Sequence, residues 1–331
     1  MREFIRRLPK AELHLHIEGS LEPELMFELA GRNRIDLPYR STEEVREAYD
    51  FRDLQSFLDV YYQAMNVLRT ERDFADLMTA YLDRAAEDGV KHAEIFFDPQ
   101  AHTARGISLG AVIDGLTAGQ TAKESKISSK LILSFLRHLP AQAALETLDA
   151  AVPFLDRIDG VGLDSSEAGF PPSLFTQVFE RAAKLGLRRV VHAGEEGPAE
   201  YVRSALDDLG AERIDHGVRA IDAPDLVARL AAERVPLTMC PLSNQRLQVT
   251  PDLRDHPLKE LLDAGVRVTV NSDDPAYFGG YVAENYLAIA EALELTQYDL
   301  VTLAQNSILG SFLEEPKQRD LLAELERVRE S

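Results

Sequence analysis

The chain has 331 residues, with 36 lysines and arginines against 56 aspartates and glutamates, so its formal net charge is −20 at pH 7. Hydrophobic residues make up 45% and charged residues 28% of it, which is typical of a globular enzyme and excludes a disordered, fibrous or membrane protein. The acidic charge argues against a nucleic-acid partner, because such a binder needs a basic face to displace counterions. The composition is compatible with a homo-oligomer.

The single cysteine, Cys240, excludes an internal disulfide and a paired-cysteine metal site. A chain of this kind suits a reducing compartment. Residues 1–10 carry several basic side chains but no apolar stretch long enough for a signal-peptide core. No later segment offers the roughly 18 uncharged apolar residues that a membrane span requires. The sequence therefore predicts a cytoplasmic protein without a membrane partner.

Short β-rich runs alternate with segments of helical periodicity along the chain. This alternation predicts a parallel sheet, because a parallel connection needs a crossover long enough for a helix. Eight such units favour a closed (β/α)8 TIM barrel over an open doubly wound sheet. The expected strands cover residues 12–17, 90–98, 129–135, 160–164, 189–193, 213–216, 236–240 and 267–271, and helical stretches include 173–185, 199–209, 222–232 and 258–264.

Residues 22–88 depart from the simple alternation, since several helices in a row are expected before the second strand. Apolar residues at three- and four-residue steps form two stripes: Leu54, Phe57, Leu58, Tyr61, Met65 and Leu68, then Phe74, Leu77, Met78, Tyr81 and Leu82. Such stripes predict amphipathic helices packed on the barrel. We interpret the stretch as a helical insertion within one domain of residues 1–331. Alternatively, part of it forms a lid over the barrel mouth, with Phe51 and Phe57 as the side chains to examine.

Titratable side chains gather at the predicted strand ends, where the active sites of such barrels lie. His14 and His16 stand two residues apart in the first strand, so both project to the same face. This pair alone is a weak signal, because alternating histidines can simply be half-buried strand residues. The ends of three further strands add residues 192–195 (His-Ala-Gly-Glu), 215–217 (Asp-His-Gly) and 271–275 (Asn-Ser-Asp-Asp-Pro). Together these ends indicate a metal or proton-transfer site.

Three imidazoles and one carboxylate suit Zn²⁺, which accepts nitrogen and oxygen ligands and keeps an open position for water when catalytic. Bound zinc lowers the pKa of that water towards about 7, so hydrolytic attack becomes available at neutral pH. Many metal barrels hold two metals bridged by a modified lysine at the end of the fourth strand. Here that end, residues 162–167, contains no lysine, so one zinc ion per chain is expected.

Five motifs resemble those of the adenosine and adenine deaminases in both content and order. They are residues 9–19 (Pro-Lys-Ala-Glu-Leu-His-Leu-His-Ile-Glu-Gly), 192–195, 214–217, 240–244 (Cys-Pro-Leu-Ser-Asn) and 271–275, and they span nearly the whole chain. Each motif alone is modest, but five in this order are specific. Within that family, residues 53–58, 95–100 and 164–167 look like the adenine branch, which acts on the free base, and not like the nucleoside branch.

The resemblance implies a role for each matching position. The zinc ligands of the family match His14, His16, His192 and Asp273. Glu195 matches the acid that protonates purine N1, His216 the residue that orients and deprotonates the metal-bound water, and Asp274 the carboxylate that holds N7. The chemistry agrees with these roles. Attack at C6 pushes electrons onto N1, where a carboxylic acid stabilises the developing charge before ammonia leaves.

Glu167 and Gly162 are expected beside the substrate. Nucleoside deaminases of the family have glycine near the position of Glu167, which leaves room for a ribose. A glutamate there could instead accept a hydrogen bond from the protonated ring nitrogen that a free base exposes. A buried polar group left unpaired by the wrong substrate costs about 1–3 kcal/mol, enough to discriminate between the two. The simpler alternative is a glutamate in a surface loop.

On this resemblance, the favoured function is zinc-dependent hydrolytic deamination of adenine to hypoxanthine and ammonia, a step of purine salvage. Deamination of adenosine or of an N6-substituted adenine by the same site is an alternative. It stays open because residues 245–249 (Gln-Arg-Leu-Gln-Val) replace the more apolar stretch, with a second cysteine, expected of adenine deaminases. A second alternative is a catalytically silent purine-binding metal barrel. Glu195 and His216 argue against it, since a mere binder needs neither.

Overall fold

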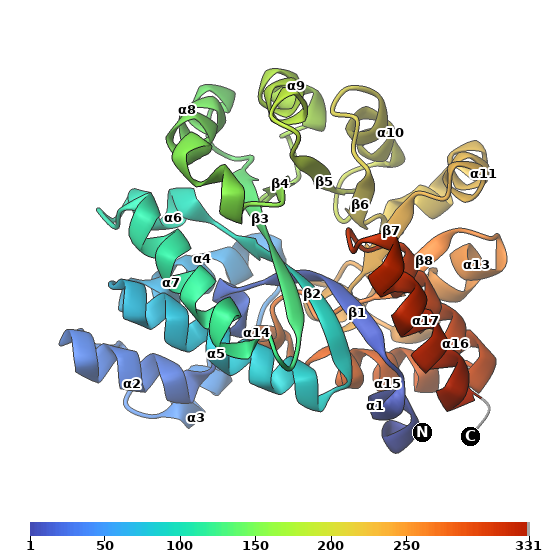
Figure 1. Cartoon of the computed structure of the whole chain (residues 1–331), viewed down its shortest axis with the longest axis horizontal. Coiled ribbons are helices and arrows are strands. Elements are labelled where there is room, and N and C mark those ends of the chain that lie inside the picture. Colours follow the sequence, from blue (N-terminus) through green and yellow to red (C-terminus); the bar gives the residue numbers. More distant parts are fainter. Residues whose placement is uncertain (330–331) are drawn as a thin grey trace.

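The computed structural model describes residues 1–329 and contains eight parallel strands hydrogen-bonded in chain order (Figure 1). The sheet closes into a barrel where Leu15 bridges Asp273, because His16 N donates to Asp273 O and Asp273 N donates to His14 O, each at 3.1 Å. Every predicted strand is confirmed. The strands are β1 (Lys10–His16), β2 (Val90–Phe97), β3 (Ser128–Leu136), β4 (Gly160–Asp164), β5 (Arg188–Ala193), β6 (Arg213–His216), β7 (Pro236–Met239) and β8 (Arg267–Val270).

Helices lie between successive strands and surround the sheet, as a (β/α)8 barrel requires (Figure 1). The four helical stretches predicted after β4 are confirmed as α9 (Thr176–Lys184), α10 (Ala199–Asp207), α11 (Pro224–Glu233) and α13 (Leu258–Asp263). The remaining helices of the ring and its ends are α1 (Arg2–Arg7), α6 (Pro99–Thr103), α7 (Leu109–Lys123), α8 (Ala141–Ala151), α12 (Pro241–Arg246), α14 (Pro275–Phe278), α15 (Val282–Ala292), α16 (Gln297–Leu309) and α17 (Glu315–Arg329). Across residues 1–329, none of the helices is long and apolar enough to cross a membrane.

The stretch predicted as an insertion contains α2 (Pro23–Asn33), α3 (Thr42–Glu47), α4 (Leu54–Ala64) and α5 (Glu71–Glu87). Helix α5 packs against α7 in the outer ring, so it is the ordinary crossover helix between β1 and β2. Only α2 to α4 are additional, and the insertion is smaller than expected. Both apolar stripes are buried, as predicted. Helix α4 begins at a capping box in which Asp53 accepts a 2.8 Å hydrogen bond from Ser56 N.

Side chains fill the barrel and close it at the end where the strands begin. Phe96, Ile132 and Val190 form an inner cluster against which Phe312, from the segment after α16, packs. The Arg213 guanidinium lies 4.8 Å from the Phe312 ring and 2.5 Å from Glu94 Oε2. Burial alone would raise the pKa of Glu94, but the charges and hydrogen bonds of Arg213 and His92 together outweigh it and lower the pKa to about 2. The beginnings of the strands are thus closed by packed side chains, and the polar strand ends at the opposite side are left to form a site.

Candidate active site

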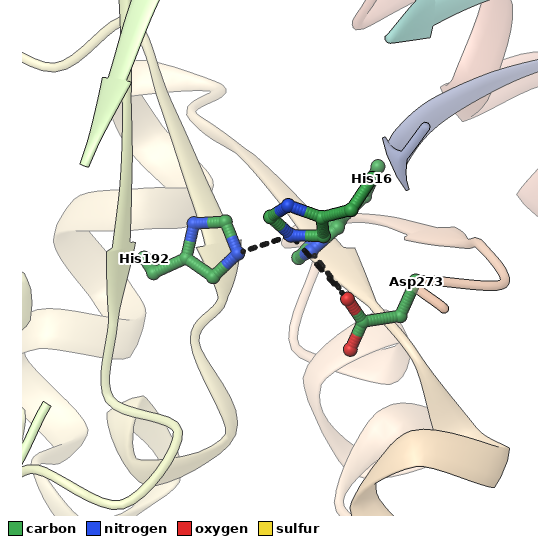
Figure 2. A group of neighbouring side chains, drawn as sticks. His16, His192 and Asp273 are labelled. Atoms are coloured by element: carbon green, nitrogen blue, oxygen red, sulfur yellow. Dashed lines mark hydrogen bonds and ion pairs between the residues drawn. The ribbon is translucent and has the colours of Figure 1, made fainter. Parts of the chain in front are cut away.

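The four side chains predicted as metal ligands meet at one point of the barrel mouth. His14 and His16 come from β1, His192 comes from β5 and Asp273 follows β8 (Figure 2). The Nε2 atoms of His16 and His192 lie 3.1 Å apart. Asp273 Oδ1 lies 3.2 Å from His14 Nε2 and 3.5 Å from His16 Nε2. Barrel closure therefore brings four buried donors, from three strand ends, within 4.8 Å of one another.

Two of the imidazoles are oriented through Asp215, at the end region of β6. His14 Nδ1 lies 3.0 Å from Thr238 Oγ1, whose hydroxyl donates to Asp215 Oδ1 at 2.8 Å. His192 Nδ1 lies 3.5 Å from the other carboxyl oxygen of Asp215. Metal-binding histidines commonly have such outer partners, which fix the tautomer and the ring orientation. The Nε2 atoms are therefore left to face the cluster.

This donor set fits a zinc ion. His14 Nε2 is completely buried yet has no hydrogen-bond partner among residues 1–329. Burial lowers the pKa of His16 to about 4, so its imidazole is neutral, the form that binds metals. Three nitrogens and one carboxylate oxygen match the ligands that zinc accepts in catalytic sites. Asp273 adopts the left-handed region with φ of 65°, a strained conformation that is typical of functional positions.

Glu195 and His216 lie beside the cluster, as the sequence predicted. Glu195 Oε2 is 3.5 Å from His216 Nε2, which is 3.8 Å from Asp273 Oδ2. Burial, and next the charge of Asp273, raise the pKa of Glu195 well above its usual range, which favours the protonated carboxyl group. Burial, and next the neighbouring His14, lower the pKa of His216 to about 3, so its imidazole is neutral. The cluster is thus flanked by a carboxyl group with a raised pKa and an imidazole with a lowered pKa.

Asp274 lines the same cavity because a glycine stands against it. A Cβ at Gly19 would lie 1.9 Å from Asp274 Oδ1, so a larger residue would displace the carboxyl group. Within the described chain, that oxygen has no hydrogen-bond partner. Burial, and next the charge of Asp273, raise the pKa of Asp274. A buried polar atom without a partner at a cavity wall is a place where a ligand can bind.

The cluster forms the floor of a cavity of about 40 Å³ that α4 covers. Apolar and aromatic side chains form this cover: Leu54, Phe57, Leu58 and Tyr61 from α4, with Phe278 from α14. Part of the predicted insertion therefore does lie over the barrel mouth. Phe57 lines the cavity, whereas the Phe51 ring packs 5.4 Å from the Phe57 ring and supports it from behind. Such a cover keeps bulk water away from the charged floor.

Glu167 does not take the position expected of it. Its carboxylate accepts hydrogen bonds from four consecutive backbone amides after β5, those of Gly194 at 2.7 Å, Glu195 at 3.0 Å, and Glu196 and Gly197 at 2.8 Å each. Its side chain is 1% exposed, so the surface-loop alternative is wrong too. Successive amides of this kind form an anion-binding nest, which the chain fills with its own carboxylate. Glu167 therefore holds the loop that carries Glu195, and its oxygens are not free for a purine.

Gly162 also lies away from the position expected of it. It sits within β4, where a Cβ would lie 2.7 Å from Ser134 Oγ. The cavity is lined by Asp164, two residues further along the strand, and Gly162 is not among the lining residues of the described chain. Glycine here is explained by the close approach of β3.

Two lining carboxyl groups, Asp98 and Asp164, were missed as site residues. Asp98 follows β2 and Asp164 ends β4, so the rule that places barrel active sites at strand ends would have indicated both. In the sequence, these stretches indicated only the branch of the family. Burial raises the pKa of Asp164 to about 7, and burial together with the nearby charge of Asp164 raises that of Asp98. Both carboxyl groups therefore form part of the cavity wall that would contact a ligand.

Comparison with known proteins gives consistent results. The family model described as adenosine deaminase matches residues 9–328. The adenine deaminase of Streptomyces coelicolor is 61% identical over 326 residues, which cover 97% of this chain and 96% of that protein. The adenine deaminase of Sphingopyxis alaskensis is 60% identical over 325 residues, with 98% and 95% covered.

Solved structures agree with the sequence matches. The crystal structure of adenine deaminase from Arthrobacter aurescens superposes with a TM-score of 0.96 at 53% identity, covering 98% of this chain and 99% of that one. An amidohydrolase from Burkhoderia ambifaria, crystallised with bound Zn, gives a TM-score of 0.90 at 27% identity, with 99% and 93% covered. The fold of the whole chain is thus shared with adenine deaminase and with a zinc-containing amidohydrolase.

Proposed function

The chain belongs to the adenosine deaminase family, and from this premise and the geometry of the cavity we propose that it deaminates adenine by hydrolysis. The products are hypoxanthine and ammonia. A C–O bond forms at C6 of the purine, and the bond from C6 to the exocyclic nitrogen breaks. The relatives named adenine deaminase match nearly the whole chain at about 60% identity, which favours the free base as substrate. Such a reaction belongs to purine salvage, and a chain with one buried cysteine suits the cytoplasm.

One zinc ion per chain is the cofactor in this proposal, held by His14, His16, His192 and Asp273. When bound, zinc acts as a Lewis acid that makes a water molecule acidic enough to serve as nucleophile near neutral pH. The crystallised amidohydrolase with Zn supports the choice of ion, as does the set of three imidazoles and one carboxylate. Asp215 supports the site by orienting two of the imidazoles.

The remaining side chains move protons and orient the purine. His216 is neutral, so it orients the attacking water and accepts its proton. Glu195 holds a proton and delivers it to N1 as electrons move from C6 into the ring. Asp274 holds N7, which fixes the plane of the base. The apolar cover from α4 excludes bulk water, so these polar groups act at low dielectric.

The observation that carries the proposal is the position of Glu195 and His216 next to the four-donor cluster. A barrel that only bound purines would need neither a protonated carboxyl group nor a neutral imidazole at that point. Hydrolysis at an amidine carbon needs both, one for the ring nitrogen and one for water.

A substrate panel tests the proposal. Purified zinc-loaded protein is given adenine, adenosine or N6-methyladenine, and turnover is followed by ultraviolet absorbance and ammonia release, with and without a chelator. We expect adenine to be the best substrate and the chelator to abolish turnover until zinc is restored. Faster turnover of adenosine would contradict the free-base assignment. Adenine binding without ammonia release would show a silent purine-binding barrel instead.

A further inference from the structure

One wall of the cavity offers hydrogen-bond acceptors that the proposed chemistry at C6, N1 and N7 does not use. Asp98 and Asp164 line this wall and are each 2% exposed. Asp98 Oδ1 and Asp164 Oδ1 lack a hydrogen-bond partner in the part of the chain that the structure describes, whereas Asp164 Oδ2 lies 3.5 Å from His16 Nδ1. Buried acceptors of this kind are costly unless a ligand supplies a donor. The wall is therefore built to meet an N–H group.

The barrel topology places this wall across the mouth from the groups that act on the purine. Strands pair in chain order around a closed barrel, so β2 and β4 face β6 and β8. His216 ends β6 and Asp274 lies just beyond β8. A purine that presents its C6 and N7 edge to those residues turns its opposite edge, with N3 and N9, towards Asp98 and Asp164.

We propose that Asp98, with Asp164 beside it, accepts the N9–H hydrogen bond of a free purine base and so determines the specificity for the base over the nucleoside. This inference rests on the proposed function. A free base has a donor at N9, whereas a nucleoside has a glycosidic bond there. A nucleoside would leave Asp98 Oδ1 buried and unpaired, a mismatch against which sites built on hydrogen bonds discriminate strongly. The role first expected of Glu167 falls to this pair.

Side chains above the pair close the space that a sugar would need. The Tyr62 hydroxyl, from α4, lies 3.1 Å from Ser165 Oγ, and His138 Nδ1 lies 2.8 Å from the same oxygen. Ser165 directly follows Asp164 and lines the cavity together with Tyr62. A substituent on N9 would have to break the contacts of Tyr62 and His138 with Ser165. Steric closure and the unpaired acceptors thus select for the same substrate.

Asp98 is the better of the two positions for a test. Asp98 N donates to Glu18 Oε1 at 3.1 Å and no side-chain hydrogen bond caps α6, so the carboxyl group, which interacts with Asp164, is not needed to start the helix. Asp164 is less suitable for substitution, since its Oδ2 lies 3.5 Å from His16 Nδ1 and so helps to orient a predicted zinc ligand. Replacing the Asp98 side chain therefore leaves the local backbone contacts in place, and the zinc content of the variant is measured because the carboxyl group lies within 4.8 Å of a ring nitrogen of His16.

The experiment compares adenine with 9-methyladenine, which carries a methyl group in place of the N9–H. For the wild type we expect kcat/KM to favour adenine by at least about 100-fold. Asp98→Ala should lower kcat/KM for adenine at least about tenfold and leave that for 9-methyladenine unchanged or raised, so the preference falls. Asp98→Asn keeps an amide oxygen that can accept, so it should retain part of the preference. Asp59→Ala, an exposed aspartate on α4, is the matched control and should keep the wild-type ratio.

Four results would overturn the inference, and they are distinguishable from one another. Equal turnover of adenine and 9-methyladenine by the wild type would overturn it and leave the proposed function intact. An unchanged preference in Asp98→Ala would place the discrimination elsewhere in the cavity. Loss of zinc from Asp98→Ala, measured by elemental analysis, would assign the carboxyl group to the metal site. Failure of the zinc-loaded wild type to deaminate adenine would overturn the proposed function and this inference with it.

Discussion

Two carboxyl groups beside the same imidazoles are held in opposite protonation states. The neighbouring imidazoles, chiefly His14, outweigh the effect of burial and keep the pKa of Asp273 well below its usual range. Glu195 has no such partner at Oε1 within residues 1–329, and burial raises its pKa. The difference in surroundings separates a ligand from an acid, although both residues are equally buried.

Replacing Glu195 by glutamine keeps the size of the side chain but exchanges the carboxyl group for an amide, which has no acidic proton to transfer. We expect Glu195→Gln to lower turnover of adenine at least about 100-fold, since a positioned general acid contributes on that order. Zinc content and the thermal midpoint should not change, because the carboxyl group is no ligand in this account. Steady-state kinetics and elemental analysis check both points, with exposed Glu200→Gln as the control. Full activity in Glu195→Gln would refute the assigned role.

Glu167 acts through the loop that it holds. Glu167→Gln exchanges one acceptor oxygen for an NH2 group that faces backbone N–H groups, so the loop after β5 should lose its position. We expect kcat for adenine to fall at least about tenfold while KM changes less, because the acid and not the binding wall is displaced. Gly197→Ala should act alike, since its Cβ would lie 2.6 Å from Glu167 Oε1. An effect confined to the thermal midpoint, with kcat retained, would count against this positioning role.

Helix α4 covers the cavity with one aromatic stripe. Phe57 is 3% exposed, and its ring lies 5.0 Å from that of Tyr61 and 4.7 Å from that of Phe278. Phe57→Ala removes the centre of this cover, so we expect KM for adenine to rise by about tenfold or more with a smaller effect on kcat. Tyr298→Ala, on α16, is the control because that residue is 72% exposed. An unchanged KM would show that α4 takes no part in binding.

The elements themselves were largely predictable, because their signals are local. Buried parallel strands appear as short apolar runs, and the stripe on α4 follows the helical period. The extent of the insertion was not predictable in this way. Whether α5 is an extra helix or the crossover helix depends on its packing against α7, a contact between distant parts of the chain. Periodicity predicts a helix and its apolar face, but it does not predict which element packs against that face.

The same limit explains which site residues were found. His14, His16, His192 and Asp273 were predicted because strand ends of a barrel converge and because the motifs match a family. The direction of Glu167 could not be predicted, since it depends on the fold of the loop after β5. Asp98 and Asp164 lie at strand ends and could have been found by the same rule, whereas their proximity to each other requires the register of β2, β3 and β4. Functional residues at strand ends can be predicted from the sequence, whereas contacts between loops cannot.

Stability should depend on pH through Lys10, which is buried where β1 begins. Its Nζ donates to Asp88 O at 2.6 Å, and burial lowers its pKa from 10.5 to about 7 although the Asp88 charge partly opposes this. Unfolding exposes the amine and restores its usual pKa, so between these values the unfolded chain binds more protons than the folded chain. The free energy of unfolding therefore rises with pH through that window, by up to about 1.4 kcal/mol per pH unit.

Lys10→Met removes this dependence. Between pH 7 and pH 9 we expect the wild type to gain about 2 kcal/mol of unfolding free energy relative to Lys10→Met, measured with denaturant. Lys184→Met, at an exposed position on α9, should show no such change. A difference between wild type and Lys10→Met that stays constant with pH would mean that the buried amine keeps its charge.

The proposed reaction depends on one ion held by four side chains, and anomalous diffraction at the zinc absorption edge measures that directly. We expect a crystal of the zinc-loaded protein to show one strong peak at about 2.0–2.2 Å from three imidazole nitrogens and one carboxylate oxygen. Those ligands should be His14, His16, His192 and Asp273. A crystal without a peak there, or with its peak between Asp98 and Asp164, would contradict the proposed centre.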